Sequence, residues 1–239
     1  VAVAVAVAVA KNKKNKLGIL QTNKTAVDSK TIDFSLAKSK NLLLIFTRNP
    51  ELGKCKTRLA AKVGDESALA IYKFLLHHTV QTTAGLYAKK TVFYSEEIWE
   101  DDIWDTSIFD KELQHGTDLG ERMANAFLEG FQNKFEKIIV IGSDMHDLNQ
   151  EDLEEAFKAL DENDFVVGPA IDGGYYLLGM KRFKPALFKN KDWGTSSVLQ
   201  HTLKSLEGES LTLLKPKNDV DHYEDIKDIK AFAPYLKHM

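Results

Sequence analysis

Short apolar runs alternate with segments of helical periodicity along most of the chain. The runs have the length and composition of buried strands, and they lie at residues 42–46, 91–95, 137–141, 164–168, 175–180 and 211–214. Helical patterns cover residues 65–83, 119–131, 150–160 and 196–206, and a last helix is expected from Tyr223. This alternation predicts an α/β fold, a Rossmann-like and mostly parallel sheet with helices on both faces.

Residues 1–40 do not share this pattern. The repeat VAVAVAVAVA precedes the basic run KNKKNK, which is the reverse of the order of charged and apolar segments in a signal peptide. We interpret residues 1–40 as an artefactual low-complexity extension, with a natural edge strand as the alternative, and residues 41–239 as a single domain. The acidic stretch 96–110, which has no clear period, is expected to be an excursion on the surface.

Composition excludes several classes of protein. The net charge of −3 among 239 residues argues against a general nucleic-acid binder, which would carry a basic surplus. A single cysteine, Cys55, rules out an internal disulfide framework and a cysteine-rich metal site. No apolar run reaches the roughly 18 residues of a membrane span. We therefore expect a soluble cytoplasmic protein.

The first candidate site is the basic loop that follows the strand at 42–46. It contains Gly53 and four cationic side chains, those of Arg48, Lys54, Lys56 and Arg58. A central strand that ends in a basic, glycine-containing loop before a helix is how α/β proteins receive phosphate. These residues are predicted to bind a nucleotide. The alternative is a basic loop exposed to solvent.

A second candidate is Asp144, which follows the strand at 137–141 within GSDMHD. One strand-end carboxylate beside a phosphate loop can hold Mg²⁺ or Mn²⁺, because these ions take oxygen ligands together with substrate phosphates. The alternative is that Asp144 or Asp147 caps the next helix, and for Asp147 the two readings are balanced. His146 is favoured neither as a metal ligand nor as a proton carrier.

Three further segments carry weaker signals. The first segment consists of Asp172, Gly173, Gly174 and Tyr175. Its paired glycines would let the backbone approach a ligand closely, but the same sequence also suits a tight turn between two strands. In the second, one of Asp219 and Asp221 can cap a helix and leave the other as a second metal ligand. In the third, Trp193 is a candidate pocket wall, although a lone tryptophan more often serves packing.

Six motifs, in order, carry a resemblance to a known family. They are FTRNPELGKCKTRLA, DLGERM, GSDMHDL, GPAIDGGYYLLG, DWGT and DVDHYED, which span residues 41–229. Their order and spacing resemble the bacterial radical-SAM/selenium-domain-associated transferases, which are relatives of nucleotide-diphospho-sugar transferases. The resemblance implies the glycosyltransferase-A fold. More distantly, the chain looks like the guanylyltransferases that act on phospholactate or molybdenum cofactor.

The resemblance also implies roles for residues. Gly53, Lys54, Lys56 and Arg58 match the basic nucleotide-phosphate loop, and Asp144 matches the metal-binding aspartate. Asp172, Gly173 and Gly174 match a segment on the acceptor or sugar side, and Asp219 and Asp221 fall where related enzymes often place a second metal contact. Gly120, Glu121 and Arg122 match a loop without an assigned role. Met145 and His146 depart from the family, in which a small or thiol residue and a proline are expected.

These observations lead to one main hypothesis and two alternatives. The main hypothesis is a metal-dependent transferase that uses a nucleotide sugar and an unidentified acceptor, with Lys56 and Arg58 stabilising the leaving diphosphate and Asp172 as the base. The first alternative is a nucleotidyltransferase, in which an acceptor phosphate attacks a nucleoside triphosphate and pyrophosphate leaves. The second is a nucleotide-binding protein without turnover.

Overall fold

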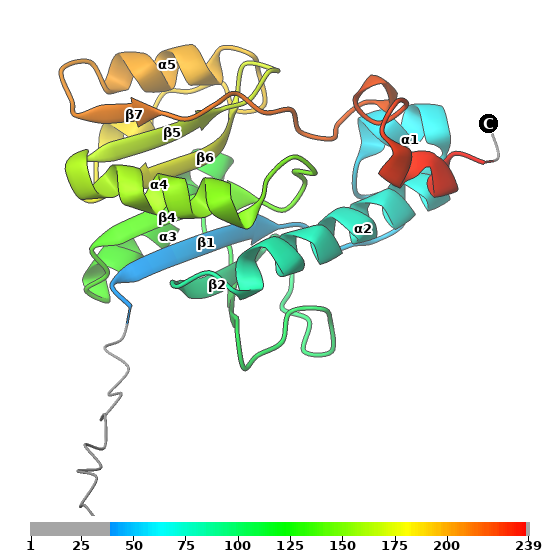
Figure 1. Ribbon diagram of the computed structural model, residues 1–239, viewed down its shortest axis with the longest axis horizontal. Helices are drawn as coiled ribbons and strands as arrows, with labels where there is room; N and C mark the ends of the chain where they lie inside the picture. The colour runs from blue at the N-terminus through cyan, green and yellow to red at the C-terminus, as the bar shows by residue number, and fades with distance from the viewer. Residues whose placement is uncertain (1–38, 238–239) are drawn as a thin grey trace, which may run out of the picture. The chain divides into compact units, whose positions relative to one another are not determined.

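The computed structural model describes residues 39–237, which form an α/β fold around one seven-stranded sheet (Figure 1). The prediction for residues 1–40 therefore lies, up to residue 38, outside the described residues. The strand order is β3-β2-β1-β4-β6-β5-β7, and only β6 runs antiparallel to its neighbours. The strands are β1 (Asn41–Thr47), β2 (Lys89–Tyr94), β3 (Asp110–Leu113), β4 (Lys137–Gly142), β5 (Phe165–Pro169), β6 (Tyr175–Met180) and β7 (Leu211–Leu213). The predicted fold class is confirmed.

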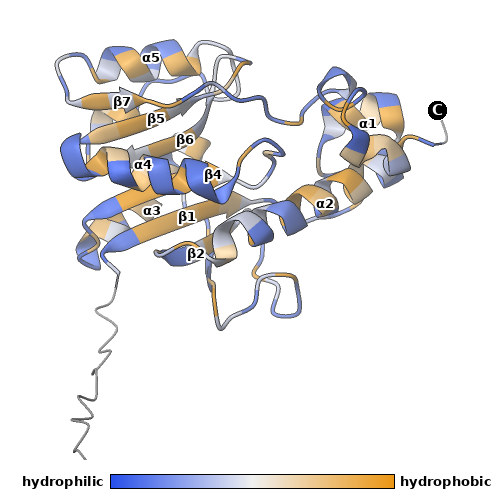
Figure 2. Ribbon diagram, in the orientation of Figure 1, coloured by the Kyte–Doolittle hydropathy of each residue, from blue (hydrophilic) through white to orange (hydrophobic). Residues whose placement is uncertain are grey.

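Helices cover both faces of the sheet, because successive side chains of a strand point to opposite faces. Leu43 and Ile45 of β1 pack under α2 (Asp65–Ala84) and α4 (Gln150–Glu162). Leu42 and Leu44 pack on the other face under α3 (Leu119–Gln132) and α5 (Val198–Ser205). Since both faces are covered, the central strands are apolar along their length, as Figure 2 shows.

Local capping fixes where the helices begin. Asp118 accepts a hydrogen bond from the Glu121 amide at 2.8 Å and so caps α3. Asn149 caps α4 and forms a reciprocal pair with Asp152. The alternative role of Asp144 or Asp147 as the cap of that helix is therefore wrong.

Five elements differ from the sequence-based prediction. A short helix, α1 (Thr57–Val63), follows the basic loop, and Gly64 with φ 83° separates it from α2. The strand β3 lies at the edge of the sheet, where periodicity is hard to detect. The last helix is replaced by two 3₁₀ turns, η2 (Tyr223–Asp225) and η3 (Lys230–Tyr235), and Pro234 interrupts helical hydrogen bonding in the second. A further turn, η1 (Pro185–Leu187), precedes α5.

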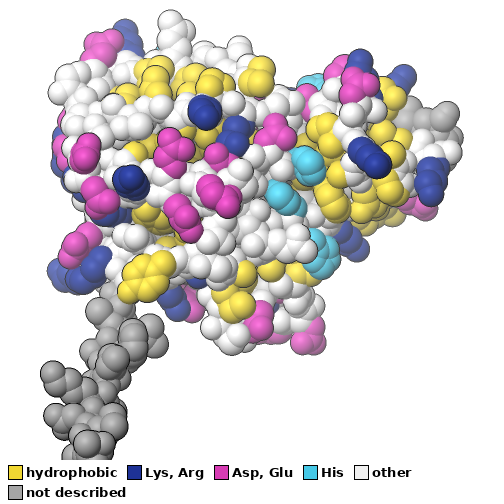
Figure 3. Space-filling model, in the orientation of Figure 1, with side chains coloured by type: hydrophobic (Ala, Val, Ile, Leu, Met, Phe, Trp, Pro, Cys, Tyr) yellow, Lys and Arg dark blue, Asp and Glu magenta, His cyan; other side chains and the backbone are white. Residues whose placement is uncertain are grey.

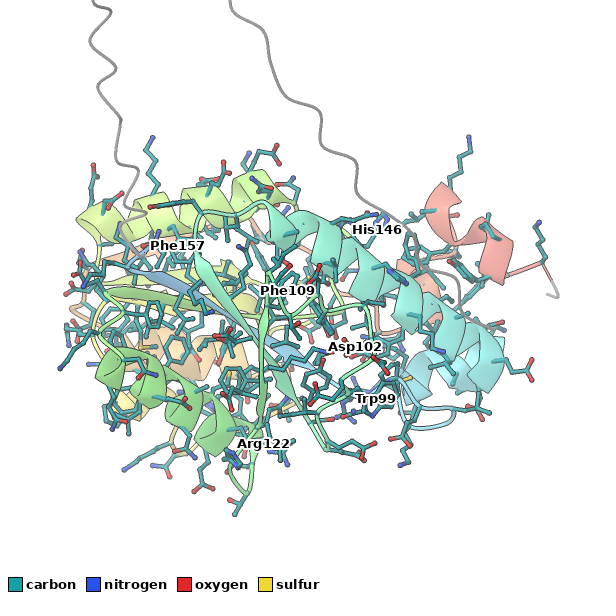
Figure 4. The ribbon with its side chains drawn as sticks, turned by 90° about the horizontal axis from the view of Figure 1, so that it is seen from below. Trp99, Asp102, Phe109, Arg122, His146 and Phe157 are labelled. Carbon is teal, nitrogen blue, oxygen red and sulfur yellow. The ribbon has the colours of Figure 1, made fainter. Side chains whose placement is uncertain are left out.

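The acidic excursion before β3 lies mostly at the surface, as expected, but two of its aromatic side chains anchor it in the core. Trp104 is 2% exposed and meets Phe109 edge to face, with ring centroids 5.1 Å apart. Asp102 accepts hydrogen bonds from Tyr94 and from the buried ammonium of Lys111. Figure 4 shows Trp99 and Asp102 close together on this excursion. Two buried aromatics and an ion pair thus tie the segment to β2 and β3.

The chain after β7 returns to the carboxyl ends of the parallel strands. Ile226 and Phe232 are fully buried against Leu59 of α1 and Ile71 of α2, and Figure 1 shows η2 and η3 beside these helices. This packing brings the Asp219–Asp221 segment next to β4. In the part of the chain from 39 to 237, no helix combines the length and hydropathy needed to cross a bilayer.

Candidate active site

A cavity of about 800 Å³ opens at the carboxyl ends of β1, β2 and β4. This is the edge of an α/β sheet at which ligands usually bind. Nine charged side chains line the cavity, five cationic and four acidic. They are Arg48, Lys54, Lys56, Arg58 and Arg122, with Glu96, Asp118, Asp144 and Asp221. The cavity therefore suits a large anionic ligand with polar groups, such as a nucleotide.

The Lys56 side chain turns inward from the basic loop. Its backbone has φ 50°, a left-handed conformation, and its side chain is 8% exposed. The ammonium lies 2.8 Å from Oδ2 of Asp144. Burial acts to raise the pKa of Asp144, but the charge and hydrogen bond of Lys56, a backbone hydrogen bond and the charge of Arg48 together outweigh it, so the pKa lies below its ordinary value. The Lys56–Asp144 pair is thus ionised on both sides.

Two further cations of the loop are also paired with carboxylates. Arg58 Nη1 lies 2.6 Å from Oδ2 of Asp221, and Lys54 lies 2.9 Å from Glu51 and 3.7 Å from Glu96. Lys54 is exposed, so its ion pairs are screened by solvent. The basic loop therefore faces the cavity with cations that are largely balanced by neighbouring carboxylates. Gly53, with φ 74°, provides its turn and does not line the cavity.

A buried hydroxyl network fixes the ends of β1 and β4. Tyr72 of α2 receives a hydrogen bond from the Arg48 amide at 2.9 Å, and its hydroxyl lies 3.2 Å from those of Thr47 and Ser143. Ser143 directly precedes Asp144. The network therefore sets the position of Asp144 and of the basic loop together.

Asp219 lies close to two other carboxylates. The Val220 amide donates to the Asp144 carbonyl at 3.3 Å, which holds this segment against the end of β4. Burial, followed by the charges of Asp144 and Asp172, raises the pKa of Asp219 to about 6. Asp219 itself does not line the main cavity.

The carboxylates of Asp144, Asp219 and Asp221 suit a divalent cation whose remaining ligands come from a bound substrate. Among residues 39–237, no three His, Cys, Asp or Glu side chains form a ready chelate. Mg²⁺ commonly takes only one or two carboxylates and completes its shell with phosphates and water. Burial is the main cause of the raised pKa of Asp219, and repulsion from Asp144 and Asp172 adds to it; such a cation would relieve this repulsion. Asp144 and Asp219 are the side chains that would hold it, with Asp221 at the cavity wall.

The turn between β5 and β6 forms one wall of a second pocket, of about 210 Å³, beside the main cavity. Asp172, Gly174, Tyr175 and Trp193 line it. Gly173 does not, but its φ is 93° and a Cβ there would lie 2.3 Å from the Ser196 carbonyl oxygen. The glycine therefore permits close packing of this turn against the segment before α5.

Gly120, Glu121 and Arg122 lie in the first turn of α3, and not in a loop as the resemblance implied. A Cβ on Gly120 would lie 2.5 Å from the Phe188 carbonyl and 2.6 Å from the Trp193 ring, so the helix packs directly on that tryptophan. Glu121 accepts hydrogen bonds from the amide and hydroxyl of Thr117. Arg122 donates to the Gly116 carbonyl at 3.2 Å and lines the main cavity.

His146 lies among aromatic rings. Its ring is 5.9 Å from Phe74, 5.4 Å from His78 and 5.0 Å from Phe232, centroid to centroid. Figure 4 places it at α2, and Figure 3 shows histidine side chains gathered beside a hydrophobic surface. Met145 is buried. The two residues that depart from the expected motif thus join the loop after β4 to α2 and η3.

Sequence reasoning missed three residues that shape the site. Tyr72 looks like an ordinary apolar position on a helix. Gln114 donates to the carbonyls of Thr47 and Phe93 and so joins β1 to β2, yet it lies in a segment without periodicity. Asp225 accepts from the amides of Asp221 and His222, and only its place three residues after His222 hints at a cap.

Comparisons with known proteins agree with this geometry. The family model described as "Uncharacterized protein conserved in bacteria (DUF2064)" matches residues 79–195, a little under half of the chain. A comparison with curated proteins gave no match.

Two solved structures share the fold. One, from Desulfovibrio desulfuricans G20, is provisionally named a nucleotide-diphospho-sugar transferase. It is 29% identical, with a TM-score of 0.74 over 84% of this chain and 95% of that chain. The other is the homolog of Mycobacterium tuberculosis Rv0371c from Mycobacterium sp. strain JC1. It is 13% identical, with a TM-score of 0.52 over 84% of this chain and 100% of that chain. The chain therefore has the fold of nucleotide-diphospho-sugar transferases.

Proposed function

We propose that the chain is a metal-dependent transferase that uses a nucleotide-activated donor, with a nucleotide sugar as that donor. One observation carries the proposal: Lys56, Arg58, Asp144 and Asp221 meet at the wall of a cavity of about 800 Å³. The similarity to a protein provisionally named a nucleotide-diphospho-sugar transferase, at 29% identity, supports it.

In the proposed reaction, the nucleoside diphosphate of the donor lies against the basic loop. Mg²⁺ or Mn²⁺, when bound at Asp144 with Asp219 and Asp221, supplies positive charge to the diphosphate. Arg48, Gly53 and Lys54 bind or shape the phosphate site. Lys56 and Arg58 stabilise the negative charge that develops as the bond from the sugar to the diphosphate breaks. This electrostatic help requires both cations to turn from their carboxylates toward the phosphates.

The acceptor side is assigned to the second pocket. Asp172 takes the proton of the acceptor nucleophile, whose electron pair forms the new bond to the sugar while the diphosphate leaves with its own pair. Gly173, Gly174, Tyr175 and Trp193 form or support the walls around these groups. Asp172 lies at the rim of this pocket and repels Asp219, so it is held in an acidic setting.

Nucleotidyl transfer is the alternative, because five cations suit a nucleoside triphosphate as well as a sugar diphosphate. A nucleotide-binding protein without turnover is the third reading. Cytoplasmic location, the absence of a nucleic-acid partner, and the association with radical-SAM and selenium-domain proteins stay predictions.

A product assay tests the proposal. The protein, with Mn²⁺ or Mg²⁺, is incubated with a panel of nucleotide sugars and, separately, of nucleoside triphosphates. We expect nucleoside diphosphate from one nucleotide sugar, lost on chelation and in Asp144→Asn. Asp147→Asn is the matched control, because Asp147 is exposed and lies three residues away. Pyrophosphate from a triphosphate would replace the proposal with nucleotidyl transfer, and metal-independent nucleotide binding without product would leave the third reading.

A further inference from the structure

The second pocket differs in character from the main cavity beside it. Its walls are mostly apolar and aromatic, and Phe46, Leu119 and Gly142 are common to both cavities. The volume of about 210 Å³ lies below the roughly 300 Å³ at which pockets begin to hold whole drug-sized molecules. The pocket is therefore sized for one ring-sized group that reaches the edge of the main cavity.

The three hydroxyl groups of this pocket are already engaged within the protein. Tyr175 donates its hydroxyl to the Met123 sulfur at 3.7 Å, and Tyr176 donates to the Lys215 carbonyl at 3.1 Å. Thr195 donates to the Asp192 carbonyl at 2.8 Å. Asp172 accepts from the Gly174 amide through Oδ1, which leaves lone pairs on its carboxylate for a ligand. Besides the indole N–H of Trp193, the side chains of the pocket therefore offer a ligand one carboxylate and apolar walls.

The distribution of charge separates the two cavities. Five lysine and arginine side chains line the large cavity, whereas the described lining of the small one contains none, and no histidine. A phosphate needs cations or clustered amides, and one placed here would instead meet the Asp172 carboxylate. An uncharged alcohol needs no cation, and its hydroxyl can donate a hydrogen bond to that carboxylate.

We infer that the small pocket receives the acceptor, and that the acceptor is an uncharged alcohol with an apolar, ring-sized body and no phosphate at the reacting end. The inference rests on the proposed transfer from a nucleotide-activated donor. The acceptor O–H proton passes to Asp172, and the oxygen forms the new bond to the donor sugar. The bond from the sugar to the diphosphate breaks, and its electron pair leaves with the nucleoside diphosphate. The site thereby favours glycosyl transfer over attack by an acceptor phosphate.

The test compares two matched probes, benzyl alcohol and benzyl phosphate, by ligand-observed NMR with the full chain and no donor. At ordinary ligand efficiency, molecules of this size bind with roughly millimolar affinity or weaker, so titration to well above 1 mM is needed. We expect the alcohol to bind the wild-type chain at least about tenfold more tightly than the phosphate. Equal or tighter binding of the phosphate, or no binding of either probe, would overturn the inference.

Three variants locate the binding and its electrostatic origin. Asp172→Asn keeps the shape of the turn. It should reduce the difference in affinity between benzyl alcohol and benzyl phosphate, because it removes the negative charge that repels the phosphate. Thr195→Arg, at an exposed position on the pocket rim, should improve phosphate binding. Leu128→Arg introduces the same charge on the exposed face of α3, away from the pocket, and should leave the ratio unchanged. Equal effects of the two arginines would place the binding elsewhere and defeat the inference.

Because these measurements contain no donor, their failure is distinguishable from failure of the proposed function. Release of nucleoside diphosphate into water without an acceptor tests the donor half alone. Donor hydrolysis with no preference for the alcohol would keep the transferase and reject this acceptor class. Preference for the alcohol without any donor turnover would keep the assignment of the small pocket and reject the proposed transferase activity.

Discussion

Lys56 donates a hydrogen bond to Asp144 across 2.8 Å and across 88 positions of sequence. The pair joins the basic loop to the end of β4. This contact helps to fix the position of the basic loop relative to Asp144 in the proposed phosphate site. It also helps to keep Asp144 ionised at neutral pH, since the charge and hydrogen bond of Lys56, with smaller contributions from the backbone and Arg48, outweigh the effect of burial on the pKa of Asp144. The carboxylate is therefore in the protonation state that a divalent cation requires.

Lys56→Met should impair both turnover and stability. Methionine keeps much of the volume of lysine but leaves the Asp144 carboxylate without its cation. Because Asp144 is about one third exposed, we expect a loss of about 1–3 kcal/mol in the free energy of unfolding, less than for a fully buried pair. Donor hydrolysis should fall by about 10²–10³-fold.

Urea unfolding and the product assay measure these two effects of Lys56→Met. Lys158→Met, on the exposed face of α4, is the control and should change neither. A Lys56→Met protein with wild-type turnover would show that the lysine is only structural.

Tyr72→Phe should change the position of the site with little change in its chemistry. The substitution removes the hydroxyl that accepts from the Arg48 amide and meets Thr47 and Ser143. We expect a cost of about 1–3 kcal/mol, since a buried amide loses its partner, and a larger effect on KM for the donor than on kcat. Denaturation and steady-state kinetics measure this, with Tyr87→Phe at an exposed position as the reference. Unchanged KM in Tyr72→Phe would contradict the positioning role.

Gly120→Ala should disturb the contact between α3 and Trp193. The new methyl group would lie 2.6 Å from the tryptophan ring and 2.5 Å from a carbonyl oxygen, so backbone or ring must shift. A loss of about 1–3 kcal/mol in stability is expected, together with weaker binding in the small pocket.

Gly85→Ala is the matched control for Gly120→Ala. Its methyl group would meet only the side-chain oxygen of Gln150, which can rotate away. Thermal unfolding of both proteins decides the matter, and equal melting temperatures would show that α3 tolerates the methyl group.

Asp225→Asn should reduce the acid sensitivity of the fold. Burial acts to raise the pKa of Asp225, but hydrogen bonds from Asn218, His222 and Asp221 outweigh it and lower the pKa below its ordinary value. A depressed folded-state pKa contributes stability that is complete above the unfolded value of about 4 and is lost as pH falls through the folded value.

Urea unfolding at a series of pH values measures this contribution. The wild-type chain should lose more stability between neutral and acidic pH than Asp225→Asn does. Parallel pH profiles for the two proteins would refute the assignment.

The sequence was sufficient for the features that arise from local pattern. Leu42–Phe46 is apolar because both faces of β1 are buried, and Asp144 follows such a strand, so its place at the sheet edge was predictable. Other features depend on contacts between distant segments. The α1 helix was missed because Pro50, Gly53 and dense charge indicate a loop, whereas Leu59 is buried only by the returning C-terminal turns. Similarly, no local pattern predicts that the Tyr72 hydroxyl will contact that of Ser143, which lies 71 positions later in the sequence.

The reversed strand β6 has a consequence for how this site can change. The large cavity lies at the carboxyl ends of β1, β2 and β4. The Asp172 turn connects β5 to β6, and because β6 is antiparallel, it is the start of β6 that lies at this edge of the sheet. Residues of this turn other than Gly173, which packs against Ser196, can therefore be replaced without altering the strands that carry the basic loop and Asp144. Under the proposed function, substitutions in this turn would change the choice of acceptor while the residues proposed to bind the donor stay the same.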